Sequence, residues 1–125
     1  MSDMNEDSLP VLLNSIQSRL VSSQRQLSIV NAQMKGRARE AKLQELTMEQ
    51  LQGLGDQTRV YKGVGKLFIE ENFQNAVSEA EKRRTEALEE NRMLEKKCAF
   101  YEKEVAEARK HLQDLVKSME KASVA

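Results

Sequence analysis

The feature that most constrains this chain is a pair of long heptad patterns, separated by a short segment with no heptad period. In the first pattern an apolar series recurs at every seventh position, and a half-polar series follows three residues later. The two series are Leu13, Leu20, Leu27, Met34 and Ala41, and then Ile16, Ser23, Val30 and Arg37. Such a repeat is typical of a helix that buries one narrow seam against another helix.

A second heptad pattern fills the C-terminal half of the chain. It contains neither Pro nor Gly, so a helix can run uninterrupted over about residues 73–121. Its seam consists of Val77, Arg84, Asn91, Cys98, Val105, Leu112 and Met119, interleaved with Ala80, Ala87, Leu94, Tyr101, Ala108, Leu115 and Ala122. A helix of about 48 residues is roughly 70 Å long and needs a partner along its side.

The first helix is the partner that the sequence offers. In an antiparallel pair of helices, the residue numbers of any two facing residues add up to the same sum. One such register places the seam of the first helix against the seam of the second. Its facing pairs are Ile16 and Met119, Leu20 and Leu115, Leu27 and Ala108, Val30 and Val105, and Met34 and Tyr101. We therefore predict a mainly α fold, a long antiparallel two-helix coiled coil that turns back near residue 67.

The segment between the two patterns predicts a short helix and then a β-hairpin. Thr47 with Gln50 three residues later is a capping-box pattern, which predicts a short helix over 48–53 after a first helix over about 9–45. Residues 59–71 lose the helical period and are rich in strand formers. Gly65-Lys66 has glycine first in a two-residue loop, as a type II′ hairpin turn prefers. This predicts strands at about 60–64 and 67–71.

A lone two-stranded hairpin is marginal in water, and the rest of this sequence has no other strand-like segment. The hairpin is therefore predicted to pair with strands of other chains.

Charge and hydropathy argue against nucleic-acid and membrane partners. The chain has 20 basic and 20 acidic residues, whereas nucleic-acid binding needs excess positive charge. No run of residues approaches the roughly 18 apolar residues of a membrane span. The first seven residues carry three acids and no base, unlike a targeting peptide. We expect a soluble, cytoplasmic protein with a disordered tail at 1–8 and a single domain over 9–125.

The sequence predicts no enzyme, cofactor or metal site. Gly63-Val64-Gly65-Lys66 lacks the first glycine and the final hydroxyl residue of a phosphate-binding loop. His111 shares a helical face with Glu107, but one His and one Cys do not supply a third metal ligand. Cys98 and His111 lie about 20 Å apart along one helix, too far for a nucleophile and its base.

Apolar residues gather at the start of the first helix and near the end of the second, beyond what one seam uses. They are Leu9, Val11, Leu12, Ile16, Leu112, Leu115, Val116 and Met119. In the antiparallel arrangement they meet at the tip farthest from the hairpin. Two interpretations remain open. The tip either closes the coiled coil, or it forms an adaptable apolar surface that binds non-native chains.

Residues 58–69, Thr-Arg-Val-Tyr-Lys-Gly-Val-Gly-Lys-Leu-Phe-Ile, resemble the central signature of beta-class prefoldin subunits. The resemblance implies a hetero-hexamer of two alpha-type and four beta-type subunits, in which hairpins combine into β-barrel-like platforms. It also implies that the hairpin forms the interface between subunits, through Val60, Tyr61, Val64, Leu67, Phe68 and Ile69. It implies a chaperone without a cofactor, whose coiled-coil tips hold unfolded proteins such as actin and tubulin without ATP. It further implies delivery of these clients to the cytosolic chaperonin.

Two other functions fit parts of the sequence. A scaffolding or tethering coiled coil fits the heptads but has no use for the apolar hairpin. A helical DNA-binding zipper could use Lys82-Arg83-Arg84, but the neighbouring Glu79, Glu81 and Glu86 neutralise that cluster.

Overall fold

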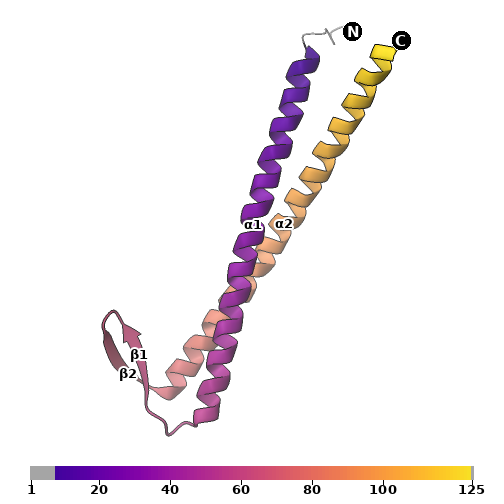
Figure 1. The fold of residues 1–125 in the computed structure, drawn as a ribbon. Coiled ribbons are helices and arrows are strands. Elements are labelled where there is room, and N and C mark those ends of the chain that lie inside the picture. The colour runs from indigo at the N-terminus through magenta and orange to yellow at the C-terminus, as the bar shows by residue number, and fades with distance from the viewer. Residues whose placement is uncertain (1–7, 125) are drawn as a thin grey trace. The chain divides into compact units, whose positions relative to one another are not determined.

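Two long helices with a β-hairpin between them make up the structure, a computed structural model that describes residues 8–124 (Figure 1). The elements are α1 (Ser8–Leu54), β1 (Val60–Val64), β2 (Leu67–Glu71) and α2 (Phe73–Val124). The predicted fold class and both strands are confirmed. The tail predicted at 1–8 lies outside the described residues, apart from Ser8, which belongs to α1.

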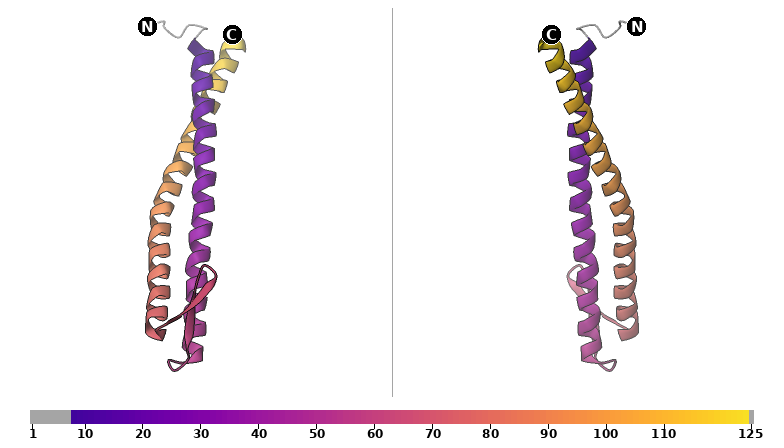
Figure 2. Two further views of the ribbon diagram at one scale, coloured as in Figure 1. Left: turned by 90° about the vertical axis from the view of Figure 1, so that its left-hand side faces the viewer. Right: turned by 90° about the vertical axis from the view of Figure 1, so that its right-hand side faces the viewer.

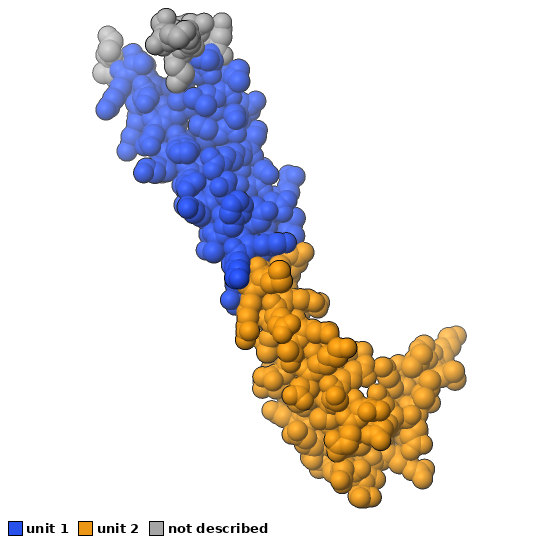
Figure 3. Space-filling view, turned by 180° about the vertical axis from the view of Figure 1, so that it is seen from behind, with its two compact units in different colours: residues 1–32, 95–125 blue, residues 33–94 orange. Residues whose placement is uncertain are grey.

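The chain forms two compact units, and each contains part of both helices (Figure 3). The first, here called the terminal unit, consists of Met1–Ala32 and Glu95–Ala125. The second, the hairpin unit, is Gln33–Leu94. Within each unit the two helix segments run side by side in opposite directions (Figure 2). In the described chain, neither helix is long and apolar enough to cross a membrane.

The predicted seams are the buried faces of both helices. Among the residues that the structure describes, all the buried hydrophobic residues are predicted seam positions: Val30, Ala41, Ala80, Ala87, Val105 and Ala108. Ser23, a polar seam position, is also buried. Four of the six buried apolar residues are alanines, so the helices can approach closely but bury little area per position.

The alignment of the two helices differs from the prediction. That alignment would place Arg19 opposite Val116, but Arg19 Nη2 lies 3.0 Å from Glu104 Oε2 in the terminal unit. In the hairpin unit, Arg37 Nη1 lies 3.5 Å from Glu90 Oε2, whereas the predicted partner was Cys98. The helices are thus shifted by about one heptad from the predicted register.

The connector between the helices explains this shift. Moving one helix by a heptad keeps seam against seam, so the heptad pattern cannot select the register. The loop 55–59 precedes the hairpin, whereas only Asn72 separates the hairpin from α2. The middle of the connector therefore lies before residue 67, and α2 begins opposite the end of α1.

A disulfide should report this register directly. Cys98 Sγ lies 3.5 Å from Asn31 Oδ1, so these two side chains meet between α1 and α2 in the terminal unit. We expect Asn31→Cys to form an intramolecular disulfide with Cys98 under mild oxidation, detected as a loss of two hydrogens by mass spectrometry. Arg37→Cys, which faces Cys98 in the sequence-based alignment, should stay reduced. The reverse outcome would restore the sequence-based register.

The short separate helix predicted at 48–53 is wrong, because α1 continues without a break to Leu54. Thr47 does not cap a new helix. Its Oγ1 donates a hydrogen bond to the Leu43 carbonyl, 2.8 Å away, as threonines inside helices do. The residues around Thr47 include no proline and are good helix formers, so nothing ends the helix there.

Local signals determine where the helices stop and the hairpin turns. Gly55 follows α1 with φ of 87°, the left-handed conformation of a helix C-cap. The Asn72 Oδ1 accepts from the Gln74 backbone N–H at 2.8 Å and so caps the start of α2. Gly65 has φ of 62°, while Lys66 has no positive φ. A type I′ turn needs a positive φ at both central residues, whereas a type II′ turn needs it only at the first. The predicted type II′ turn therefore fits.

Candidate functional sites at the hairpin and the helix ends

The hairpin carries apolar side chains on both of its faces. The strands pair antiparallel, with Val60 opposite Glu71 and Val64 opposite Leu67. Directly opposite residues share a face, and successive residues alternate. One face therefore holds Val60, Val64, Leu67 and Ile69, and the other holds Tyr61 and Phe68. Phe68 lies opposite Gly63, with its ring beside the glycine.

These apolar side chains are largely exposed in the isolated chain. The exposed fractions are 56% for Tyr61, 49% for Val64, 69% for Leu67, 79% for Phe68 and 53% for Ile69. Val60 is half-buried against the helices. Within the described residues the sheet has only these two strands, so both edges are unpaired. A conspicuous apolar surface of this kind marks an interaction site.

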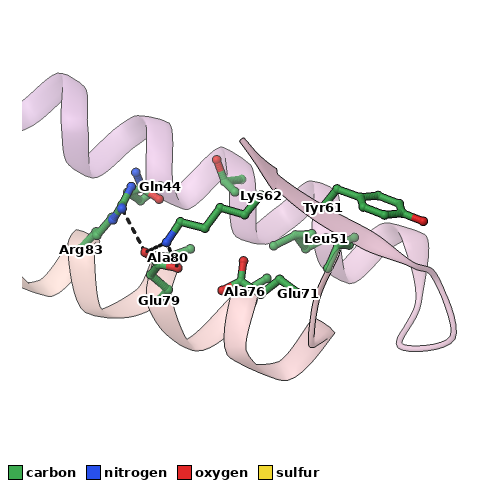
Figure 4. A pocket seen from close by; sticks show the side chains of 11 residues that line it. Gln44, Leu51, Tyr61, Lys62, Glu71, Ala76, Glu79, Ala80 and Arg83 are labelled. Atoms are coloured by element: carbon green, nitrogen blue, oxygen red, sulfur yellow. Dashed lines mark hydrogen bonds and ion pairs between the residues drawn. The ribbon is translucent and has the colours of Figure 1, made fainter. Parts of the chain in front are cut away.

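A charged network ties the hairpin to α2, as Figure 4 shows. Lys62 Nζ of β1 lies 3.0 Å from Glu79 Oε1, and Arg83 Nη2 lies 2.9 Å from the same oxygen. The three side chains line a cavity of about 220 Å³ together with Leu51 of α1 and Val60 of β1. Sequence reasoning missed this network, because Lys62 and Glu79 are far apart in the chain and no motif links them.

The network lowers the pKa of Glu79 below its usual range, chiefly through the hydrogen bond from Lys62 and further through the charges of Lys62 and Arg83. A carboxyl with a depressed pKa in the folded state contributes stability that is present above pH 4.5 and lost as the pH falls through the folded value. Burial opposes this shift, and Glu71 of β2 reinforces it through a hydrogen bond.

We expect Lys62→Met to move the pKa of Glu79 back toward its ordinary value, because the largest cause of the shift is then removed. Carboxyl titration by NMR measures this directly. Lys82→Met removes a neighbouring lysine that is not among the causes of the Glu79 pKa shift, so it should leave the Glu79 titration unchanged. An equal pKa of Glu79 in the wild type and in Lys62→Met would contradict the ion pair between the hairpin and α2.

The terminal unit brings the start of α1 and the end of α2 to the same end (Figure 2). Four of the predicted tip residues are exposed, namely Val11 (69%), Leu12 (37%), Val116 (40%) and Met119 (39%). The other four, which are half-buried, are Leu9, Ile16, Leu112 and Leu115. Leu112 and Val116 also line a surface hollow of about 530 Å³ with Lys117 and Glu120. The sequence-predicted tip is therefore a partly exposed apolar patch.

The remaining candidate chemistry does not assemble. Across residues 8–124, no group of three or more His, Cys, Asp or Glu side chains could hold a metal ion. Burial, together with the nearby Glu102 carboxylate, raises the pKa of the Cys98 thiol. A raised pKa lowers the thiolate fraction, which is the reactive form.

Comparison with known proteins agrees with the hairpin between antiparallel helices. A family model described as prefoldin subunit matches residues 14–119. The chain belongs to the prefoldin subunit family. The predicted resemblance to this family is confirmed, and membership makes the chain a chaperone subunit.

Curated relatives in the prefoldin family carry the name of one subunit. The probable prefoldin subunit 1 of Schizosaccharomyces pombe is 28% identical over 108 residues, covering 86% of this chain and 96% of the relative. Human prefoldin subunit 1 is 26% identical over 101 residues, which cover 81% of this chain and 83% of the human protein. The prefoldin beta subunit from Thermococcus strain KS-1 has the same fold, with a TM-score of 0.51 and 22% identity over 98% of this chain and 96% of that one.

Proposed function

We propose that this chain is a beta-type subunit of a prefoldin hexamer with two alpha-type and four beta-type subunits, which binds unfolded proteins without ATP. The observation that carries the proposal is a two-stranded hairpin with apolar residues exposed on both faces, Phe68 being 79% exposed. The same chain exposes a second apolar patch at its helix ends. Two separate surfaces fit two separate tasks, assembly and client binding.

Assembly through the hairpin would remove the unfavourable exposure. Strands of neighbouring subunits at both edges would satisfy the free backbone N–H and C=O groups and cover the apolar faces. Each large side chain that becomes fully buried contributes roughly 1.5–3 kcal/mol. The exposed set of Tyr61, Val64, Leu67, Phe68 and Ile69 supports a barrel-like platform built from several hairpins.

Client binding at the tip would be weak at each subunit and strong in combination. Val11, Leu12 and Val116 offer small exposed apolar areas, and each square ångström buried contributes about 25 cal/mol. Met119 is flexible and adapts to different apolar segments. Several tips acting on one unfolded chain raise the overall affinity, while each contact still releases quickly. Such a binding mode needs no nucleotide.

We further assign the clients and the location by family likeness. Unfolded actin and tubulin are the proposed clients, the cytosolic chaperonin is the proposed recipient, and the cytoplasm is the proposed location. The membership of the prefoldin subunit family supports this assignment.

Light scattering tests the proposal. Chemically unfolded actin is diluted into buffer with the hexamer reconstituted from this chain and its partner subunits. We expect suppressed aggregation without nucleotide, and no further effect of ATP. Aggregation equal to that of actin alone, or suppression only with ATP, would contradict the proposed activity.

A further inference from the structure

The outer face of α1 in the hairpin unit carries a stripe of exposed leucines. Leu43, Leu46 and Leu54 are 55%, 44% and 61% exposed. Leu46 follows Leu43 by three residues, and Gln50 and Leu54 follow at further steps of four. These positions therefore share one helical face about 16 Å long. We call these three leucines the leucine stripe.

The seam of α1 cannot explain the leucine stripe. The described residues of α1 that are buried in this unit are Ala41 and Gln44. At about 100° per residue, the stripe lies on the far side of the helix from them. A helix face that remains in water normally carries charged side chains. Three leucines exposed in this way therefore indicate that another surface covers them.

The hairpin alone offers little area for a stable assembly. Each strand has five residues, or about 17 Å. A neighbour that pairs with one edge contacts a strip about 17 Å long and about 4.8 Å wide, roughly 80 Å² on each face of the hairpin. Stable interfaces bury about 800 Å² per partner. A subunit that joins at the hairpin edge thus needs a further contact surface.

The leucine stripe lies next to the hairpin on the same turns of α1. Thr47 and Leu51, which lie between the stripe and the seam, line the cavity under the hairpin together with Val60 and Tyr61 of β1. A chain that adds a strand beside β1 is therefore within reach of the stripe. The hairpin surface and the stripe belong to one compact unit.

We propose that the leucine stripe is a second assembly surface, covered in the complex by an apolar surface of the neighbouring prefoldin subunit whose strand pairs with the hairpin. The inference rests on the proposed function, because it needs the hairpin to be an assembly site. It assigns to α1 a contact with a partner subunit in addition to its contact with α2.

The test is the double variant Leu43→Lys with Leu46→Lys, titrated against the partner subunits by native mass spectrometry. Lysine is a good helix former, and both positions are exposed, so the helix itself should persist. We expect the concentration for half-maximal assembly to rise at least tenfold. The matched control is Met93→Lys with Glu89→Gln, which adds the same net charge to the exposed surface of α2 in the same unit. The control should assemble like the wild type.

A photo-crosslinker placed at residue 46 gives an independent readout. We expect a crosslink to one partner subunit in the assembled hexamer. Crosslinking to unfolded client instead, or wild-type assembly of the double variant, would overturn the inference. A self-dimer of the isolated chain that the double variant abolishes would also overturn it, because a second copy would then be the occupant. A wild-type chain that stays outside every hexamer would instead contradict the proposed function itself.

Discussion

Replacing Phe68 with aspartate is expected to abolish incorporation of this chain into a hexamer. Phe68 is the most exposed large apolar residue of the described chain, at 79%. Burying its ring in a platform of hairpins contributes roughly 1.5–3 kcal/mol. A buried, unpaired carboxylate costs more than that contribution, so the variant loses the contact and gains a penalty. The expected weakening is 100-fold or more, equivalent to about 2.8 kcal/mol.

The control for this prediction is Phe100→Asp. Phe100 is a second exposed phenylalanine, at 57%, but it lies on α2 in the terminal unit and outside the hairpin. The Phe100→Asp variant should assemble normally. Both variants should keep the helical circular dichroism of the wild type, because neither position belongs to the buried seam. Normal assembly of Phe68→Asp would remove the hairpin from the interface.

The second large effect is expected at the tip. The double variant Leu12→Ser with Val116→Ser removes two exposed apolar side chains, one from each helix. We expect the hexamer to form normally and to lose most of its suppression of client aggregation, with at least tenfold weaker client binding at each altered tip. Native mass spectrometry and light scattering on the same sample separate assembly from client binding.

The matched control lies in the same unit on the outer face of α1. Val21 and Ile29 are 54% and 45% exposed, so Val21→Ser with Ile29→Ser removes a similar apolar area away from the helix ends. This variant should suppress aggregation like the wild type. Equal activity of the tip variant and the wild type would leave the tip apolar residues with only the role of closing the coiled coil.

Much of the fold follows from local patterns in the sequence. The heptad series identifies the buried faces of both helices, including the polar position Ser23, because the seven-residue period places these positions between the two helices. The two strands and the turn follow from strand-forming residues around Gly65, whose φ is positive as the turn requires.

The features that sequence reasoning missed depend on contacts between distant residues. A shift of one heptad leaves the seams facing each other, so only contacts such as Arg19–Glu104 reveal the register. Thr47 fits both a helix cap and a helix interior, and the surrounding turns decide between them. The tie between Lys62 and Glu79 is created by the position of the hairpin against α2. The apolar residues of both candidate sites can be identified in the sequence from their positions, but their exposure depends on the folded structure.

The central claim is that this chain enters a hexamer through its hairpin. Native mass spectrometry of the chain, mixed with alpha-type and other beta-type prefoldin subunits, tests it most directly. We expect a complex of six subunits that contains the wild-type chain, and we expect the Phe68→Asp variant to be absent from that complex. A chain that stays outside every complex of six, while the other subunits assemble among themselves, would contradict the account.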